Sequence, residues 1–243
     1  MDEGFTKTVE ESRPLENSTE YRSLVGALLY VAVCARPDIA VSASILGRSV
    51  TAPTQADMAA AKRVVRYLKA TKSWQLRYDD PDGELVGYSD ADWAGDLKTR
   101  KSTTGSVFLY SGGAVSWASR LQQCVTLSSM ESEFVALCDT SQEAVWLLTL
   151  MEDFGEPEQK PLTIKEDNQS CIKFVAAERT TRRSKHVDTK HCYVKELCER
   201  KVLQLEYCPT EDMIADVLTK PVGAVKHRKL SSLLGLAAHG SGR

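Results

Sequence analysis

The first third of the chain alternates between apolar stretches at helical spacing and short polar breaks. An apolar stretch over residues 21–33 predicts a helix, and the break that follows it contains Pro37, which suits the first turn of a second helix. After another break, residues 55–72 show the period of an amphipathic helix. Its candidate buried positions are Met58, Val65 and Leu68. The pattern therefore predicts a small helical element over residues 18–75, preceded by a polar, flexible tail over residues 1–17.

From residue 76 the pattern changes to short runs separated by turn residues, which is typical of strands. The predicted strands cover residues 76–78, 85–89, 106–110, 114–119, 162–166 and 202–207. The predicted helices cover residues 129–153, a stretch after 167, 187–200 and 211–218. Strands followed by alternating helices and strands predict an α/β domain over residues 76–222, with a mixed sheet and helices packed on it. Residues 223–243 are expected to form a loosely ordered tail with one weak helical stretch.

Four acidic residues stand where strands end or in helices near them. Asp90 and Asp167 each end an apparent strand, while Glu133 lies in the first turns of a helix. Asp216 lies in the last predicted helix. Carboxylates at strand ends can converge on one edge of a sheet, where like charges raise each other's pKa. Bound Mg²⁺ removes that penalty, and two ions roughly 3.5–4 Å apart can clamp both oxygens of a phosphodiester displacement.

Neighbouring acids compete for two of these positions. Alternation puts Asp92 on the same side of the chain as Asp90, although Asp92 and Asp96 could equally be turn acids. Glu131 completes the S-x-x-E pattern of a capping box, which gives it a structural task at the helix start. Glu133 lies closer to the apolar stripe of the helix, so we choose Glu133 as the ligand.

The other two positions each keep a structural alternative. Asp167 stands beside Asn168, a good helix cap, and Asp167 could itself be only a cap. Asp216 lies on the opposite side of its predicted helix from the apolar residues, where a solvated surface acid would show the same pattern. The residues alone leave both alternatives open.

Net charge does not identify a partner. The 243 residues carry a formal charge of −2, which does not indicate a nucleic-acid binder. Local clusters of basic residues are more informative. They are Lys98, Arg100 and Lys101, and then Arg179, Arg182, Arg183 and Lys185. Each cluster could be a solvated loop, or could hold phosphates beside the acidic residues.

The seven cysteines include no C-x-x-C pair, which indicates free thiols in a reducing compartment. A zinc site at His186, His191 and Cys192 would need further ligands such as Cys198 or Cys208, but the spacing fits no standard motif. No signal peptide opens the chain, so we expect that it is not secreted. The apolar run of the first helix is too short to span a bilayer.

Six motifs follow one another in the order YSDADWAGD, KSTTGSVFLYSGGAVSWASR, LSSMESEF, EDNQS, KHVDTKH and MIADVLTKP. With EYRSLVGALLYVAVCARPDI and PTQADMAAAKRVVRYLKAT upstream, they resemble the ribonuclease H region of copia-type retrotransposon polyproteins. The resemblance covers about residues 14–222, and its first part is similar to the segment that links the reverse transcriptase to its ribonuclease H. The chain departs from the family mildly, with E-S-E-F where E-A-E-Y is usual.

The resemblance implies a ribonuclease H-like fold, with a mixed five-stranded sheet, flanking helices and a preceding helical element. It implies a nuclease that hydrolyses the RNA strand of RNA–DNA hybrids with two Mg²⁺ ions, or with Mn²⁺ as a substitute. The implied metal ligands are Asp90, Glu133, Asp167 and Asp216. The residues expected to contact nucleic acid are Lys98, Arg100, Lys101, Arg182, Arg183, Lys185 and His186. The expected protein partner is the upstream reverse transcriptase region, and no membrane is expected to take part. The expected location is a cytoplasmic virus-like particle or the nucleus.

Two other functional classes stay open. One is a catalytically silent remnant or interaction module, and the other is an integrase-like strand-transfer enzyme. The second class usually ends its triad with a glutamate on a late helix, whereas the late acid here is Asp216. Tyr78-Asp79-Asp80 resembles the Y-x-D-D hairpin of reverse transcriptases, but no polymerase fingers or palm precede it. We therefore expect no DNA synthesis.

Overall fold

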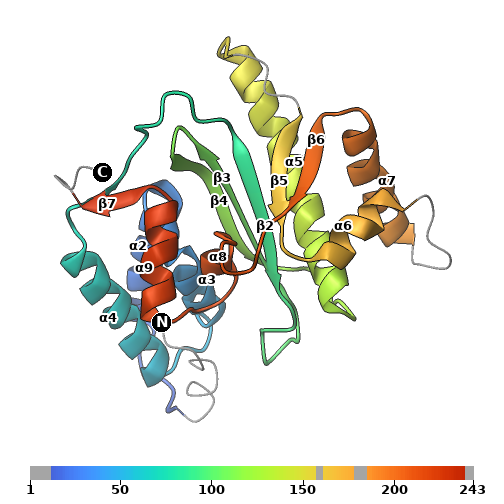
Figure 1. Ribbon diagram of the computed structural model, residues 1–243. Coiled ribbons are helices and arrows are strands. Elements are labelled where there is room, and N and C mark those ends of the chain that lie inside the picture. Colours follow the sequence, from blue (N-terminus) through green and yellow to red (C-terminus); the bar gives the residue numbers. More distant parts are fainter. Residues whose placement is uncertain (1–11, 157–160, 178–184, 239–243) are drawn as a thin grey trace.

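The computed structural model describes residues 12–156, 161–177 and 185–238. Its centre is a five-stranded sheet with the strand order β4-β3-β2-β5-β6 (Figure 1). The strands are β2 (Val86–Asp92), β3 (Thr103–Tyr110), β4 (Gly113–Leu121), β5 (Leu162–Glu166) and β6 (Leu203–Tyr207). Strands β2, β3 and β4 are antiparallel neighbours, whereas β2, β5 and β6 are parallel. This confirms the mixed five-stranded sheet that the ribonuclease H resemblance implies.

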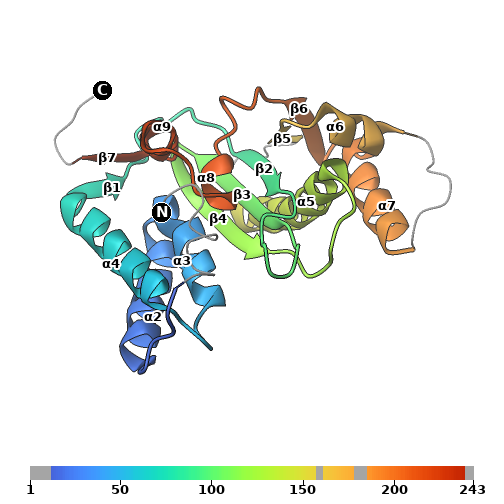
Figure 2. The same cartoon turned by 90° about the horizontal axis from the view of Figure 1, so that it is seen from below.

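Helices cover both faces of the sheet, as Figures 1 and 2 show. One face shares a hydrophobic core with α5 (Ser129–Asp153), α6 (Gln169–Ala176) and α7 (Lys185–Glu199). Side chains alternate between the two faces along β3, so Phe108 belongs to this core and its neighbour Val107 to the opposite one. Both side chains are fully buried. Polar side chains in the middle of the sheet, such as Ser89 and Asp90 of β2, are shielded from water.

The helical element predicted over residues 18–75 packs on the other face. It consists of α2 (Thr19–Cys34), the short 3₁₀ helix η1 (Pro37–Ile39), α3 (Ala40–Arg48) and α4 (Gln55–Ala70). Trp117 of β4 donates its indole N–H to the carbonyl of Ala32 at 2.8 Å, which ties α2 to the sheet. The prediction that Val65 is buried is wrong. It is 39% exposed, because Val64 takes the inward position on α4.

The chain after residue 222 is more regular than the loose tail we predicted. It forms α9 (Ala224–Leu233) and then β7 (Leu236–Ala238), which pairs antiparallel with β1 (Trp74–Leu76) in a separate two-stranded sheet. Leu230 and Leu234 are fully buried. The sequence AVKHRKLSSL of α9 has few apolar positions, so its narrow apolar stripe gives a weak periodic signal.

Several further elements differ from the prediction in their bounds. The strand predicted at 76–78 is β1, which lies outside the five-stranded sheet because its partner is at the end of the chain. The helix predicted over 211–218 is shortened to α8 (Asp216–Thr219), since the preceding residues are mostly in turns. Strand β2 continues to Asp92, so that Asp90 lies within it. Residues 1–11 of the predicted tail lie outside the described residues.

We expect Leu230→Ala to lower the free energy of unfolding by about 2–5 kcal/mol, because it removes buried methyl groups and leaves a cavity. Leu233→Ala on the same helix is the matched control, since Leu233 is 40% exposed. It should cost about 0.5 kcal/mol or less. Urea unfolding measures both values. Equally small losses for the two variants would show that α9 is not docked.

Candidate active site

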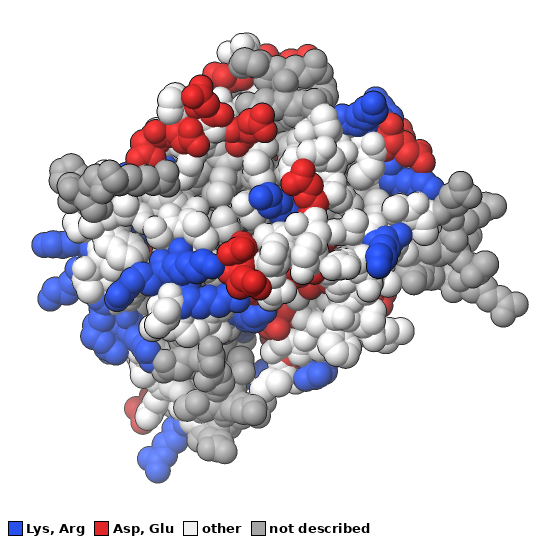
Figure 3. Space-filling model, viewed as in Figure 1, with Lys and Arg blue, Asp and Glu red and all other residues white. Residues whose placement is uncertain are grey.

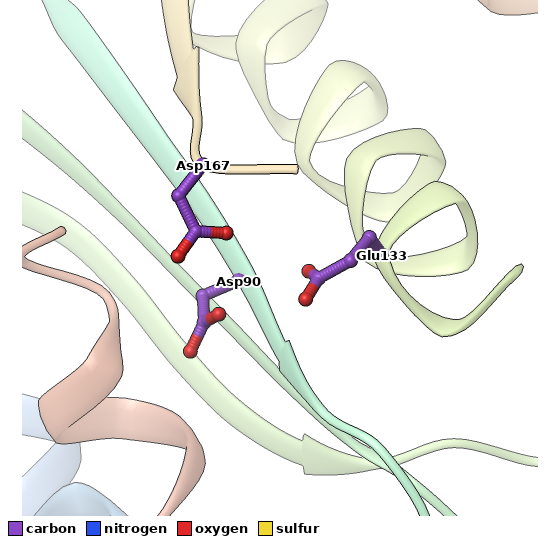
Figure 4. A group of neighbouring side chains, drawn as sticks. All are labelled: Asp90, Glu133 and Asp167. Carbon is purple, nitrogen blue, oxygen red and sulfur yellow. The ribbon is translucent and has the colours of Figure 1, made fainter. Parts of the chain in front are cut away.

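Three carboxylates meet beside the middle of the sheet (Figure 4). Strands β2 and β5 run parallel with Ser89 paired to Glu166, so the next residues, Asp90 and Asp167, lie side by side. Glu133 reaches them from the first turns of α5, which packs on β2. One carboxylate oxygen from each of the three residues lies within 4.8 Å of the other two. The structure thus brings together three of the four predicted ligands.

Most of this acidic group is buried. Asp90 is 3% exposed and Glu133 is 6% exposed, while Asp167 is half-buried. Burial and then the charge of Asp216 raise the pKa of Asp90 to about 7. Burial and then the charge of Asp90 raise the pKa of Glu133 to about 11. The backbone N–H of Ala91 donates to Glu133, but Glu133 Oε2 has no hydrogen-bond partner among the described residues. Carboxylates buried this close together are stable only if they are protonated or paired with positive charge.

A further buried acid, Glu166, adjoins the group and was missed by the sequence analysis. It is fully buried, and burial raises its pKa well above the ordinary value. Its Oε1 accepts the N–H of Asn168 at 3.1 Å, while Oε2 has no partner within the described ranges. A signal was present, because Glu166 continues the inward row of Leu162 and Ile164 at strand spacing. Glu166 adds to the carboxylates that lack compensation here.

Asp216 is buried at the start of α8, so the alternative of a solvated surface acid is wrong. Its side chain is 1% exposed, Lys220 Nζ lies 2.7 Å from Oδ1, and Lys226 Nζ contacts Oδ2. Burial acts to raise the pKa of Asp216, but hydrogen bonds from the two lysines outweigh it and lower the pKa. Thr219 donates to Asp90 Oδ2 at 2.6 Å. Helix α8 therefore touches the acidic group, although Asp216 is not one of the three carboxylates that converge.

The competing acids have other partners. Glu131 Oε2 accepts the N–H of Leu127 at 2.7 Å, so it caps the start of α5, although a capping box would use the N–H of Ser128. Asp96 pairs with Arg48 at 3.3 Å in the turn after β2. Asp92 is half-buried, which raises its pKa, and it stays outside the group of three carboxylates. Glu133 and Asp90, unlike these acids, belong to the group of three converging carboxylates.

The capping role at the start of α6 belongs to Asn168. Its Oδ1 accepts the N–H groups of Ser170 and Cys171 at 3.0 and 3.1 Å. Asp167 is therefore not needed as the cap, and its Oδ2 instead accepts the hydroxyl of Thr210 at 2.8 Å. This arrangement leaves the carboxylate of Asp167 directed towards the acidic group, as Figure 4 shows.

The basic candidates are only partly covered by the structure. Lys98 and Arg100 are exposed in the turn between β2 and β3, and Lys101 is half-buried there. The candidates Arg179, Arg182, Arg183, Lys185 and His186 lie outside the residues whose side chains are described. Nucleic-acid contact by any of them stays a prediction.

His191 is a core residue. It is 6% exposed, its Nε2 lies 2.9 Å from the carbonyl oxygen of Phe174, and its ring packs against that of Phe174. Among the described residues, Asp90, Glu133 and Asp167 are the one group of three or more His, Cys, Asp or Glu side chains placed to hold a metal. The zinc alternative therefore finds no support in that part of the chain. All seven cysteines are free thiols. None of the described helices has the length and apolar character needed to cross a bilayer.

No protein-family model matches the sequence. The chain is 37% identical over 229 residues to the retrovirus-related Pol polyprotein from transposon TNT 1-94 of Nicotiana tabacum. It is 32% identical over 223 residues to that from transposon RE1 of Arabidopsis thaliana. These alignments cover 94% and 91% of this chain but only 17% and 15% of the relatives. The secreted RxLR effector protein 161 of Plasmopara viticola is 47% identical over 128 residues, which is 52% of this chain and 90% of that protein.

One solved structure shares the fold at low sequence identity, and a second shows a weaker likeness. A foamy viral protease–reverse transcriptase in complex with dsDNA has a TM-score of 0.50 at 13% identity, over 86% of this chain and 42% of that chain. LC11-RNase H1 in complex with an RNA/DNA hybrid has a TM-score of 0.42 at 14% identity, over 56% of this chain and 94% of that chain. At such identities the likeness concerns the fold alone. The fold is α/β and ribonuclease H-like.

We expect Asp90→Asn to raise the melting temperature in chelator at pH 8, because it removes a buried charge and keeps an acceptor for Thr219. The folded-state pKa of Asp90, about 7, lies above its ordinary value of 3.8, so ionisation destabilises the fold as pH rises through that window. The gain should therefore be several degrees at pH 8, at roughly 2–4 °C per kcal/mol, and smaller at pH 5. Calorimetry measures it. A lower melting temperature would show that the charged Asp90 stabilises the fold and has a structural role.

Proposed function

Because this chain belongs to the family of Pol polyproteins of copia-type retrotransposons, we propose that it is their ribonuclease H region and hydrolyses the RNA strand of RNA–DNA hybrids. The observation that carries the proposal is the convergence of Asp90, Glu133 and Asp167 within 4.8 Å of one another. A buried set of carboxylates that forms no ion pair among the described residues has little use in a structural module. It suits an enzyme that brings divalent cations to a phosphodiester.

The donor set fits Mg²⁺, a hard cation that takes carboxylate oxygens. Oε2 of Glu133 is a buried oxygen without a hydrogen-bond partner among the described residues, which suits a metal ligand. Asp90, Glu133 and Asp167 would hold two Mg²⁺ ions together with Asp216, and Mn²⁺ would substitute. When bound, such ions activate the attacking water and stabilise the leaving 3′ oxygen.

The backbone fixes the positions of the three converging ligands. Asp90 lies in β2, the middle strand, which is paired to β3 on one side and to β5 on the other. Asp167 follows β5 directly, and Glu133 is held by the long helix α5. Ligands on regular elements of a packed core keep their geometry better than ligands on loops. The site is therefore preorganised for its cations by the sheet itself.

The hybrid would be recognised by its backbone and 2′-hydroxyl groups rather than by base edges. Lys98 and Arg100 follow β2, the strand that carries Asp90, and are exposed to make phosphate contacts. Lys101 and the segment with Arg182, Arg183, Lys185 and His186 are proposed to contribute further contacts. These contacts would hold the substrate without reading its sequence.

The upstream reverse transcriptase region of the same polyprotein is the proposed protein partner. The chain spans 17% of the tobacco relative, so a polymerase region that improves the grip on the hybrid would lie elsewhere in such a polyprotein. A cytoplasmic virus-like particle or the nucleus is the proposed location.

The protein with Mg²⁺ should cut the RNA of a labelled RNA–DNA hybrid, and chelator should abolish the cut. Glu133→Gln should lower the rate by orders of magnitude with little loss of stability, because it removes a metal ligand. Glu131→Gln is the matched control and should keep much of the activity, since glutamine still accepts the N–H of Leu127. Gel analysis of the products measures all three rates.

Several results of this assay would contradict the proposal. Equal cutting of single-stranded RNA would remove the specificity for hybrids. Strand transfer into duplex DNA would favour an integrase-like enzyme. No cutting, even with the reverse transcriptase region supplied, would favour a silent remnant. A reversed order of the two glutamate variants would make Glu131 the ligand.

Replacing Arg182 and Arg183 with Ala should weaken hybrid binding for all sequences, because phosphate contacts release counterions. The slope of log K against log salt should flatten by roughly one unit per lost contact. Arg200→Ala is the control. Arg200 follows the last residue of α7, and its side chain pairs with Glu196 at 3.3 Å. Binding titrations at several salt concentrations measure the slopes. An unchanged slope would mean that this basic segment is only a solvated loop.

A further inference from the structure

The carboxylate of Asp216 has more positively charged groups next to it than the neighbouring carboxylates have. Its buried carboxylate has one lysine on each oxygen, with Lys220 Nζ at 2.7 Å from Oδ1 and Lys226 Nζ in contact with Oδ2. Lys220 follows from local spacing, because it lies four residues after Asp216. Lys226 comes instead from α9, a separate helix. Its contact with Asp216 therefore depends on how α9 packs.

Helix α9 is firmly placed and brings positive charge to the site. Its ten residues include two lysines and one arginine, and no acid. Blue side chains gather in Figure 3 in the region where Figure 1 labels α4 and α9. Leu230 is fully buried, and His227 Nε2 lies 2.9 Å from the carbonyl oxygen of Asp38 in η1. Packing of α9 thus fixes the backbone from which Lys226 reaches Asp216.

We propose that Lys226 is a positioning residue that competes with a divalent cation for Asp216. Its ammonium group neutralises Oδ2 of Asp216, so a cation that binds this carboxylate has to compete with it. Helix α9 thereby sets how tightly the Asp216 side of the site holds its cation. The inference rests on the proposed function for the role of the cation, and it extends the site to the C-terminal helix.

The structure leaves Lys226 room to move away. Its side chain is 36% exposed, whereas that of Asp216 is 1% exposed. The segment from Lys220 to Lys226 lines an open hollow of about 600 Å³. A lysine at such a boundary can turn its ammonium into water while its stem stays on the protein. A cation that binds Asp216 can therefore displace the ammonium group of Lys226 into water.

Lys226→Met tests the competition, because methionine keeps most of the stem and removes the charge. Calorimetric titration of Mn²⁺ into the protein without nucleic acid should show binding that is tighter on the order of tenfold, since one positive charge beside the acids is gone. Lys226→Arg should bind Mn²⁺ no more tightly than the unaltered protein. Lys229→Met is the matched control on the same helix, since Lys229 pairs with Asp212 at 3.0 Å, and it should change nothing.

A second readout does not need the metal. In chelator, Lys226→Met should lower the melting temperature, because the buried Asp216 loses a partner, while Lys229→Met should not. In an Asp216→Asn background, Lys226→Met should change neither Mn²⁺ affinity nor melting temperature, since the effect acts through that carboxylate. This double-variant cycle separates a specific contact from a general change of charge.

Unchanged or weaker Mn²⁺ binding by Lys226→Met would overturn the inference. Equal tightening by Lys226→Met and Lys229→Met would overturn it as well, because a general field would then explain the effect. If neither the unaltered protein nor Lys226→Met bound Mn²⁺, both the inference and the proposed metal dependence would fail. If the Lys226 effect appeared but no hybrid were cut, only the proposed function would fail.

Discussion

Like charges buried where β2 meets β5 are the constraint on which the rest of the structure depends. Pairing of Ser89 with Glu166 places Asp90 beside Asp167, and α5 adds Glu133. Carboxylates removed from water at this density are costly unless they are protonated or paired with cations. The raised pKa values of Asp90 and Glu133, about 7 and about 11, express that cost. A fold that contains this destabilising group must gain its stability from other parts of the structure.

That stability comes from two cores, one on each face of the sheet. The first helices and the last helix of the chain share one of these cores, so both ends of the sequence support the acidic residues. Trp117 links the sheet to α2, and Thr219 links α8 to Asp90 across 129 residues of sequence. The compensation of charge is uneven. Glu133 lacks a positive partner in the described structure, whereas Asp216 has two lysines.

Much of this arrangement could be predicted because its signals are local. The helix over 129–153, the strand over 162–166 and the position of Asp167 after it all follow from periodicity and turn residues. Helix α9 and the β1–β7 pair could not be predicted, since a charge-rich helix and two three-residue strands are stabilised by partners far away in sequence. The second lysine on Asp216 could not be predicted either, because Lys226 belongs to α9 and its contact depends on how that helix packs.

Glu166 shows a different limit of prediction from sequence. Its inward position could be predicted from the strand pattern, and Asp167 is its neighbour in the chain. The charge of Asp90 beside it, however, is supplied only by the tertiary structure. Local sequence gives the face on which a side chain lies. It does not give the charges that gather there from other elements, and these charges determine what the site requires.

The central claim is that Asp90, Glu133 and Asp167 form a divalent-cation site. Anomalous X-ray scattering from crystals of the protein soaked with Mn²⁺ tests it most directly. The account predicts an anomalous peak coordinated by oxygens of these three carboxylates, and loss of that peak in crystals of Glu133→Gln. A peak that avoids all three residues, or one that is unaffected by Glu133→Gln, would contradict the account.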